Sequence, residues 1–427
     1  MSKKDSNIEW IGEIPPNWDL TPIKAVAPCK NEKNRYIGRS YLALEHMESN
    51  TGRLLSNGET MITEVDSTVS SFADTDVLFG KLRPYLAKVA RPNFSGQCST
   101  EILVLSPSDK ISKDYLFWYL LNPAFIDVVN SSTYGAKMPR ANWDFIGNCT
   151  IPVPPLEKQE KIAKYLDERC GKVDSLVSNL RKQIENLTEY KHSLITELVT
   201  NGGNPSVNLK KSGVDVFPNV PIHWSVQKTL NLLSMPITDG PHTTPELFSE
   251  GIPFVSAEAV SCGNGSIDFD HIRGYISQEF YDECCKKYVP QRNDIYMIKS
   301  GATTGRVAVV DTEKQFTIWS PLAVFRCNPN VINFKFLYYF LQSDAFQRQV
   351  QFGWTYGTQQ NIGMRTLERL KVFVPPLDEQ HTIVKFLDSK CEQLDRLISI
   401  KKSKIERLEQ YRKSLIYEYV TGKKEVS

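Results

Sequence analysis

One short run in this 427-residue chain has residue types that bind phosphate in other proteins. The run Lys299-Ser-Gly-Ala-Thr-Thr-Gly-Arg306 resembles a phosphate-binding loop, which needs four residues between its glycines and then Lys and Ser or Thr. Here three residues separate Gly301 from Gly305, and Arg306 and Val307 follow. The spacing therefore does not predict a site for nucleotide phosphates.

Other runs imitate catalytic or metal sites without completing them. Asn122-Pro-Ala-Phe125 resembles the Asn-Pro-Pro-Phe/Tyr element that holds the target amine in amino-methyltransferases, but its second proline is missing and no glycine-rich cofactor loop precedes it. The six histidines form no i, i+4 pair, and the nine cysteines form no C-x-x-C pair. We therefore expect no catalytic residue and no metal site in this chain.

The composition is that of a globular protein with balanced charge. Lys and Arg number 51 against 49 Asp and Glu, a net charge of +2, which excludes a strongly basic coat. No apolar run is long enough to cross a membrane, and residues 1–10 lack the apolar core of a signal peptide. The cysteines are odd in number and mostly scattered, as expected for free thiols in a reducing compartment. We expect a cytoplasmic protein with no membrane partner.

Two stretches in the first half combine cations and aromatic residues without any acidic residue. They are 77–100, with a net charge of +4, and 134–143. Lys and Arg bind DNA phosphates, and a bidentate Arg reads base edges. A solvated strand face or loop is the alternative for any single residue. The candidate DNA contacts in these stretches are Lys81, Arg83, Tyr85, Lys88, Arg91, Lys137 and Arg140.

The second half carries polar and basic clusters at equivalent positions, in 295–310 and 345–367. Asn and Gln can also read base edges, so these clusters suit the same task. The recurrence in both halves favours a contact surface over chance. The candidates are Lys299, Ser300, Thr303, Thr304, Arg306, Gln359, Gln360, Asn361 and Arg365.

An internal duplication organises the chain. Residues 153–200 align with 374–421 at a constant offset of 221, with 23 of 48 positions identical. Outside this stretch the repeat is weaker: Asp76-Val-Leu-Phe-Gly-Lys81 corresponds to Asp294-Ile-Tyr-Met-Ile-Lys299 at an offset of 218. The chain therefore divides into two variable segments, 1–152 and 204–373, and two near-identical ones, 153–203 and 374–427.

Both near-identical segments have the apolar spacing of a long helix. Apolar residues recur at steps of three and four from Ile162 to Leu198, including Tyr190, and from Ile383 to Tyr419, including Tyr411. The second series has one polar break, at Lys401, which stands where the first has Leu180. Such a helix would be roughly 60 Å long. Each helix has an apolar stripe to cover and no long helix next to it in the sequence, so the other long helix is its simplest partner. This favours an antiparallel coiled coil of the two helices and a pseudo-two-fold relation between the halves. Two independent helices, each lying on its own module, are the alternative.

The variable segments read as compact modules with a β core. Strand patterns cover 76–79, 101–105, 294–298 and 306–310, and each module then has one aromatic-rich helix, over 113–130 and 334–351. The fold class is therefore α+β, with two β-rich modules separated by two long antiparallel helices.

The order of these features closely resembles the specificity (S) subunit of type I restriction–modification systems, over nearly the full length. The resemblance rests on Ile-Pro-Pro-Asn-Trp18 and Val-Pro-Ile-His-Trp224, on Phe79-Gly-Lys-Leu-Arg-Pro-Tyr85, on Asp239-Gly-Pro-His-Thr-Thr-Pro245, on Ser300-Gly-Ala-Thr-Thr-Gly305, and on the two Pro-Pro-Leu-x-x-Gln helix starts.

This resemblance implies a DNA-recognition subunit without catalytic activity. The segments 1–152 and 204–373 would be target recognition domains that read the two halves of an asymmetric bipartite target, and the helices would act as a ruler between them. His242 and Thr243 join the expected DNA contacts. The partners implied are double-stranded DNA, two methyltransferase (modification) subunits docked on the helices, and restriction/translocase subunits. S-adenosylmethionine, ATP and Mg belong on those subunits, and no cofactor is expected on this chain.

Two other functions remain open on the residues alone. One is a self-sufficient DNA methyltransferase or nuclease, against which the incomplete motifs argue. The other is a structural coiled-coil adaptor, against which the paired basic loops argue. Because the total charge is balanced, we expect weak, salt-sensitive DNA binding by the isolated chain and tight binding only with its methyltransferase partners.

A module exchange tests the bipartite reading. Replacing residues 204–373 by the second module of another specificity subunit should change one half of the methylated sequence and leave the other intact. Mapping methylated positions in cells that carry the exchanged chain and the partner subunits measures both halves. A change in both halves would contradict the assignment of one module to one half-site.

Overall fold

The chain forms two compact units. A computed structural model describes residues 3–30, 33–35, 40–55, 68–135, 137–204, 206–356 and 360–426. Unit 1 consists of Met1–Lys182 and Ile400–Ser427, and unit 2 of Gln183–Ser399. Packing thus groups residues across the four sequence segments, because each unit holds one half of each long helix. The four-segment division itself stays a prediction.

In unit 1 the sheets are small and mostly antiparallel. The central strand β7 (Val77–Gly80) lies between β10 (Ile102–Leu105) and β8 (Val89–Ala90). A second sheet has the order β4 (Lys33–Arg35), β6 (Thr68–Phe72), β9 (Gly96–Ser99), β5 (Tyr41–Leu42). Two further pairs are β1 (Lys4–Asp5) with β2 (Glu13–Ile14), and β3 (Asp19–Pro22) with β11 (Thr150–Val153).

Unit 2 repeats this plan with additions. Its central strand β18 (Ile295–Ile298) lies between β21 (Leu322–Phe325) and β19 (Val307–Val309), and β15 (Thr238–Asp239) extends the sheet. β16 (Ile252–Val255) lies between β17 (Gly274–Ile276) and β20 (Thr317–Ile318). The remaining pairs are β12 (Leu209–Lys211) with β13 (Asn219–Pro221), β14 (Ser225–Lys228) with β24 (Lys371–Val374), and β22 (Thr355–Tyr356) with β23 (Gln360–Asn361). All four predicted strands are confirmed to within two residues at each end.

The single aromatic helix expected in each module is wrong, because both are broken into two. Unit 1 has α2 (Lys113–Leu120) and α3 (Pro123–Ser131), and unit 2 has α8 (Phe334–Gln342) and α9 (Asp344–Phe352). Asn122 caps α3 by accepting a hydrogen bond from the Ala124 N–H at 3.2 Å, and Pro123 occupies the first helical position. The methyltransferase-like run Asn122-Pro-Ala-Phe125 is thus a buried helix start.

The short helices complete the modules. Unit 1 has α1 (Ile23–Val26) and α4 (Trp143–Asn148). Unit 2 has α6 (Ala257–Cys262), α7 (Gln278–Cys285) and α10 (Met364–Arg369).

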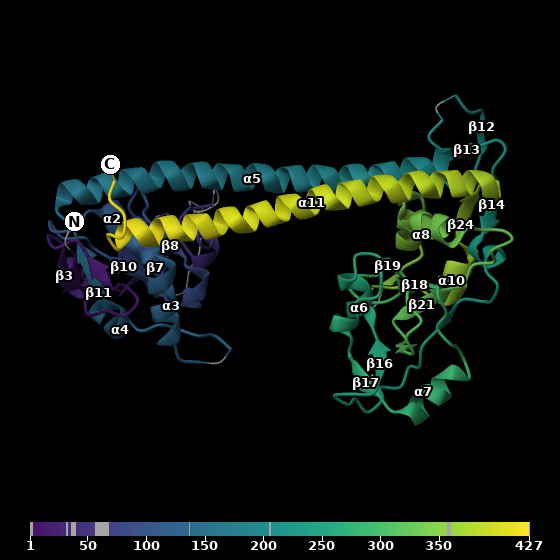
Figure 1. Ribbon diagram of the computed structural model, residues 1–427, viewed down its shortest axis with the longest axis horizontal. Helices are drawn as coiled ribbons and strands as arrows, with labels where there is room; N and C mark the ends of the chain where they lie inside the picture. Colours follow the sequence, from purple (N-terminus) through teal and green to yellow (C-terminus); the bar gives the residue numbers. More distant parts are fainter. Residues whose placement is uncertain are drawn as a thin grey trace. The chain divides into compact units, whose positions relative to one another are not determined.

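The two long helices are confirmed, and in each unit they run antiparallel. They are α5 (Leu156–Asn201) and α11 (Leu377–Val420), side by side in Figure 1. In unit 1, Tyr165 near the start of α5 stacks on Tyr419 near the end of α11, with ring centroids 4.6 Å apart. Further along, Asp174 pairs with Arg412 at 3.0 Å. In unit 2, Lys191 of α5 pairs with Asp395 of α11 at 2.7 Å. Because the repeat maps Asp174 to Asp395 and Lys191 to Arg412, both pairs mark the same helix register.

The predicted apolar stripe is wrong at one position of each long helix, and the two positions are equivalent in the repeat. Tyr190 and Tyr411 were expected on the stripe but are 56% and 52% exposed. The neighbouring cations Lys191 and Arg412 turn inward instead and pair with a carboxylate of the facing helix. A tyrosine beside an inward ion pair is rotated toward solvent because successive helix residues point about 100° apart.

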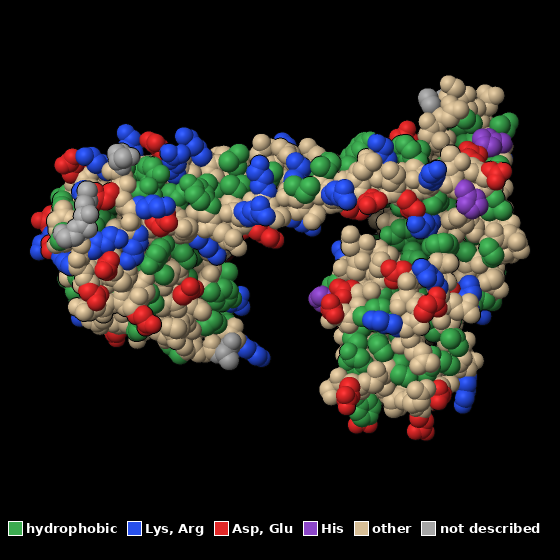
Figure 2. Space-filling view, in the orientation of Figure 1, with side chains coloured by type: hydrophobic (Ala, Val, Ile, Leu, Met, Phe, Trp, Pro, Cys, Tyr) green, Lys and Arg blue, Asp and Glu red, His purple; other side chains and the backbone are tan. Residues whose placement is uncertain are grey.

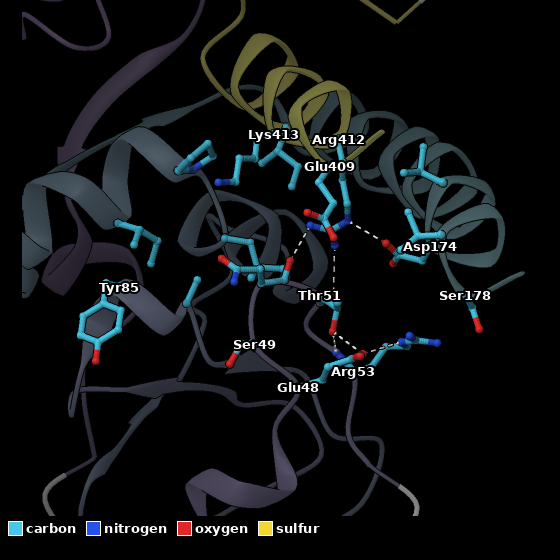
Figure 3. Close-up of a pocket in the computed structure, with 18 of the residues that line it drawn as sticks. Glu48, Ser49, Thr51, Arg53, Tyr85, Asp174, Ser178, Glu409, Arg412 and Lys413 are labelled. Carbon is cyan, nitrogen blue, oxygen red and sulfur yellow. Dashed lines mark hydrogen bonds and ion pairs between the residues drawn. The ribbon is translucent and has the colours of Figure 1, made fainter. Parts of the chain in front are cut away.

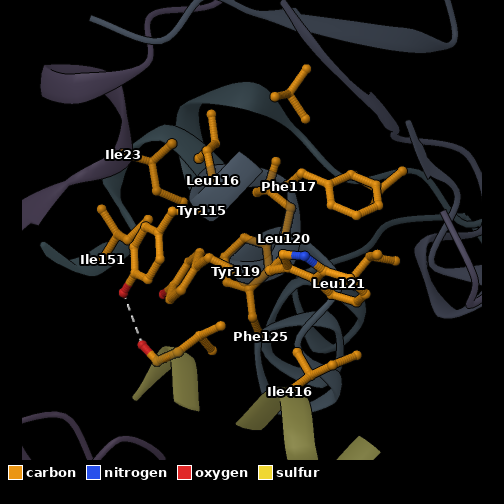
Figure 4. Packing of buried hydrophobic residues seen from close by; sticks show 14 of the residues in the cluster. Ile23, Tyr115, Leu116, Phe117, Tyr119, Leu120, Leu121, Phe125, Ile151 and Ile416 are labelled. Atoms are coloured by element: carbon orange, nitrogen blue, oxygen red, sulfur yellow. Dashed lines mark hydrogen bonds between the residues drawn. The ribbon is translucent and has the colours of Figure 1, made fainter. Parts of the chain in front are cut away.

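Each core is completed by the far end of a long helix. In unit 1 the buried aromatic residues of α2 pack near Ile416 of α11 (Figure 4), and Leu415 and Val420 of α11 belong to the same core cluster. The Tyr115 hydroxyl oxygen lies 2.8 Å from the carbonyl oxygen of Pro152 and 3.0 Å from that of Val420, so its single hydrogen is shared between the two. In unit 2 the corresponding core contains Ile195 and Val199 of α5.

A buried glutamine fastens each module to the start of its helix. Gln159 is fully buried; its Oε1 accepts the Ser112 N–H at 2.7 Å and its Nε2 donates to the Pro154 carbonyl at 2.8 Å. In unit 2, Gln380 makes the same bonds to Asn333 and Pro375, at 2.7 and 2.9 Å. The glutamine of the Pro-Pro-Leu-x-x-Gln motif therefore has a structural role: it links the module to the first turn of the long helix.

The Pro-x-x-Trp openings dock on the helix ends. Trp18 and Trp224 are buried, and Gly422 and Gly202 lie against them with φ near +70°. A side chain at Gly422 would come within 2.4 Å of Pro15, so only glycine fits this left-handed turn.

The ion pair of Arg412 should be a main determinant of unit 1 stability. Arg412 is 7% exposed, and besides pairing with Asp174 it donates to the Asn50 and Thr51 carbonyls at 2.6 and 3.0 Å. Arg412→Ala would leave Asp174 unpaired beside the core and should cost about 3 kcal/mol in urea unfolding. Arg181→Ala, which breaks an exposed pair with Glu409 on the same helices, should cost less than about 1 kcal/mol. Equal losses would show that burial of the pair is irrelevant.

Candidate nucleic-acid interface

In unit 1 the two acid-free stretches lie against each other, although 33 residues of sequence separate them. The loop after β7 pairs with the segment before α4: the Arg83 N–H donates to the Pro139 carbonyl at 2.7 Å, and the Ala141 N–H donates to the Lys81 carbonyl at 2.9 Å. Leu82 and Arg140 form the isolated antiparallel bridge between these bonds. The structure thus joins the two predicted clusters into one surface, which we call loop pair 1 (81–85 and 134–142).

Unit 2 builds the same surface with different side chains. The Gly301 N–H donates to the Gln360 carbonyl at 3.0 Å, and the Ile362 N–H donates to the Lys299 carbonyl at 2.9 Å. Ser300 and Asn361 form the antiparallel bridge. Every partner in this loop pair 2 (299–306 and 360–363) is related to its counterpart in loop pair 1 by the repeat offsets of 218 and 221. One backbone frame therefore presents two different sets of side chains.

Three of the predicted DNA-contact cations in unit 1 are engaged within the protein. Lys88 donates to the Leu44 carbonyl at 2.6 Å. Arg91 pairs with Asp114 at 2.5 Å and with Asp167, and its guanidinium lies 4.4 Å from the Phe117 ring centroid. Arg140 pairs with Glu101 at 3.1 Å, which raises the pKa of its guanidinium. These contacts give each of the three side chains a structural role.

The other predicted residues of unit 1 are available at the surface. Arg83 and Lys137 are exposed, and neither side chain has a hydrogen-bond or ion-pair partner among the described residues. Lys81 is half-buried, and Tyr85 is 49% exposed. Loop pair 1 therefore offers two unpaired cations and an aromatic ring on adjoining backbone segments.

Tyr85 also borders a cavity of about 680 Å³ between loop 48–53 and the two long helices (Figure 3). Six of its eight charged lining residues pair with one another: Arg412 with Asp174, Arg181 with Glu409, and Arg53 with Glu48. Because these charges are engaged with one another, we assign these side chains a structural role and not a role in binding DNA.

In unit 2 the buried carboxylate of Asp239 brings together two of the predicted residues, His242 and Lys299. Asp239 is 1% exposed, and its oxygens lie 2.6 Å from Lys287 Nζ, 3.3 Å from Lys299 Nζ and 3.2 Å from His242 Nε2. Burial alone would raise the pKa of Asp239, but the two lysines outweigh it, so the pKa lies below its usual value. Thr243 is exposed on the same turn. Asp239 and Lys287, which were not predicted, thus position His242 and Lys299.

In the glycine-rich run 299–306, several backbone N–H groups bond to carbonyls of the run itself or of the preceding strand β18. The Thr304 N–H and hydroxyl both donate to the Gly301 carbonyl, the Gly305 N–H to Ile298, and the Arg306 N–H to Thr303. Because these three backbone donors are satisfied within the protein, they are not available to cradle a phosphate. Arg306 is exposed and donates to the Ser261 carbonyl at 3.3 Å, while Thr303 is half-buried.

The last candidates lie on the second strand of loop pair 2 and just beyond it. Gln360 and Asn361 form β23 and are exposed, and Arg365 is exposed in the first turn of α10. Gln359 lies outside the described residues.

Sequence reasoning also missed two buried carboxylates, one at the start of the central strand in each unit. Asp76 and Asp294, each 1% exposed, precede β7 and β18 at the repeat offset of 218. Asp76 binds Lys30 at 2.7 Å, and Asp294 binds Arg326 at 2.7 Å. Their recurrence in the duplicated Asp-x-x-x-x-Lys motif was the available signal.

The surface charge is mixed at short range. On the face shown in Figure 2, Lys and Arg side chains are interspersed with Asp and Glu over both units. None of the described helices is long and apolar enough to cross a membrane. The described part of the chain also has no group of three or more His, Cys, Asp and Glu arranged to hold a metal ion.

These features define a class: a protein built from two copies of a β-rich module, each with a side-chain set of its own, closed by an antiparallel helix pair. The profile described as the Type I restriction modification DNA specificity domain matches residues 5–186 and 241–410. The chain therefore belongs to this family, and its two-domain architecture fits a role in recognising a bipartite DNA target.

Individual proteins agree with this assignment. The MjaVIII specificity subunit of Methanocaldococcus jannaschii is 26% identical over 77% of this chain and 74% of its own length. The MjaX specificity subunit of the same organism, described as putative, is 26% identical over 97% and 95%. A solved chain from a study of complex assembly and conformational transition in a type I system superposes with a TM-score of 0.70 at 19% identity, over 95% of this chain and 98% of that one, which shows a common fold.

The division between engaged and available cations can be tested by a matched pair of substitutions. Arg91→Ala removes two charge-assisted pairs and a ring contact and should lower the free energy of unfolding by about 2 kcal/mol. Lys137→Ala removes an exposed, unpaired side chain and should change it by less than about 0.5 kcal/mol. Urea unfolding of both variants gives the comparison. A large loss from Lys137→Ala would contradict its assignment as an available surface cation.

Proposed function

We propose that this chain is the non-catalytic specificity subunit of a type I complex, and that each loop pair contacts one half of an asymmetric bipartite DNA target. The single observation that carries the proposal is the shared backbone frame of the two loop pairs. Two loop pairs with the same backbone bonds and different side chains suit two readers that approach one duplex in the same way but recognise different sequences.

The loop pairs offer the side-chain types that this task requires. Arg83 and Lys137 in loop pair 1 are unpaired cations suited to phosphates. Gln360, Asn361 and the nearby Arg365 have the hydrogen-bonding groups that read base edges. Tyr85 adds an exposed ring beside the cations.

The chemistry would belong to partner subunits. Two methyltransferase subunits would dock on the charged faces of α5 and α11, and restriction/translocase subunits would join them. S-adenosylmethionine, ATP and Mg would be bound by those subunits and not by this chain. The complex would act in the cytoplasm, where its DNA substrate lies. Because loop cations here are few and the total charge is balanced, the isolated chain would bind DNA weakly.

The helix pair would set the unspecified gap between the half-sites. Matched insertion of seven residues after Leu180 and after its repeat equivalent Lys401 keeps the apolar seam in register and lengthens both helices by about 10 Å. The gap should grow by about three base pairs, at 3.4 Å each, while both half-sites stay the same.

Mapping methylated positions genome-wide in cells that carry the variant and its partner subunits measures gap and half-sites together. The unmodified chain in the same cells is the control. An unchanged gap would contradict the ruler, and the absence of any methylated bipartite motif with the unmodified chain would contradict the proposed function.

A further inference from the structure

The loop after β7 holds a strained backbone at an exposed arginine. Arg83 has φ 52° and ψ 61°, in the left-handed region that residues with a side chain rarely adopt. Pro84 follows it, and proline restricts the preceding residue to extended conformations. Arg83 therefore occupies a conformation that is unfavourable on two counts.

Unit 2 supplies an internal comparison. The equivalent of Arg83 is Gly301, with φ 103°, and Gly301 makes the equivalent backbone bond to the facing strand. Glycine adopts this conformation without strain. The same turn can thus be built with glycine, and the arginine side chain in unit 1 is not needed to form it.

Among the described residues, no hydrogen bond or ion pair accounts for the arginine side chain. It is exposed and has no hydrogen-bond or ion-pair partner among the described residues, whereas Lys88, Arg91 and Arg140 all have partners. Its backbone is nevertheless held firmly, by the 2.7 Å bond to the Pro139 carbonyl. Strain at an exposed, unpartnered but rigidly mounted side chain points to a ligand outside the chain.

We propose that Arg83 contacts a backbone phosphate of the first half-site and that the strained turn exists to aim its guanidinium. A phosphate fits better than a base edge because the unpaired cation Lys137 lies two residues before Pro139, the residue paired with Arg83, so the two cations suit successive phosphates of one strand. Glu101, whose backbone carbonyl accepts the Lys81 N–H of this loop, has its carboxylate paired with Arg140. As a phosphate contact, Arg83 positions the module on the duplex and does not read its sequence. This inference rests on the proposed function.

Two truncations separate backbone strain from the DNA contact. Arg83→Gly and Arg83→Ala both remove the guanidinium, but only the glycine variant relieves the left-handed strain. Arg83→Gly should therefore unfold about 2 °C above Arg83→Ala. A glycine variant less stable than the alanine variant would overturn the strain argument.

DNA binding is measured on the complex with the methyltransferase subunits, using a duplex that carries the methylated motif and an unrelated duplex. Both truncations should weaken binding to both duplexes about tenfold, and the slope of log K against log salt should become less negative by about one. Arg83→Lys, which keeps the charge, should retain most of the affinity. Ala87→Gly, at the other left-handed residue of the loop (φ 42°), removes no charge and should bind like the unmodified chain.

Each failure has a separate meaning. Unchanged affinity in the truncations would overturn the contact with DNA. A methylated motif relaxed at one base position, with no change in salt dependence, would overturn the phosphate assignment and indicate base reading. If the unmodified complex methylates no motif, the proposed function itself fails.

Discussion

The antiparallel pairing of α5 and α11 is the interaction on which the rest of the structure depends. Each unit takes the end of one long helix and the beginning of the other, and both segments are built into its core. Ile416 and Val420 are as buried in unit 1 as the aromatic residues of α2. A module separated from the opposite helix end would therefore expose part of its core to water. The modules and the helices are parts of one folding unit in each half.

Equivalent contacts show how one architecture carries two specificities. The buried glutamines, the ion pairs of the long helices and the bonds of the loop pairs recur in both units at the repeat offsets. All of them lie in the frame or the core, where packing and hydrogen bonding constrain the residue type. The exposed side chains on that frame are free to differ. Leu82 and Arg83 in unit 1 stand where unit 2 has Ser300 and Gly301.

A balanced total charge is compatible with a DNA-recognition surface because some of the candidate cations are paired with carboxylates inside the units, whereas others are not. Arg91, Arg140 and Lys299 each face an acidic side chain, so they add little net field. The unpaired cations, such as Arg83 and Lys137, sit on loops where their charge is available. The local pairing of each cation therefore says more about DNA binding than the net charge of all 427 residues does.

The sequence by itself determined the repeat, the strands and the long helices, because these follow from periodicity and from duplication at a constant offset. It favoured antiparallel pairing of the two helices but left two independent helices open, and the contacts between α5 and α11 decided between them. It did not determine the break at Asn122, where a capping residue and a proline override an apolar run. Nor did it separate Arg91, turned toward Asp114 and Asp167, from Arg83, which has no partner among the described residues. Only the tertiary structure decided this, because the partners of a side chain come from distant parts of the chain. The strain at Arg83 likewise depends on a backbone bond to Pro139, which no local pattern encodes.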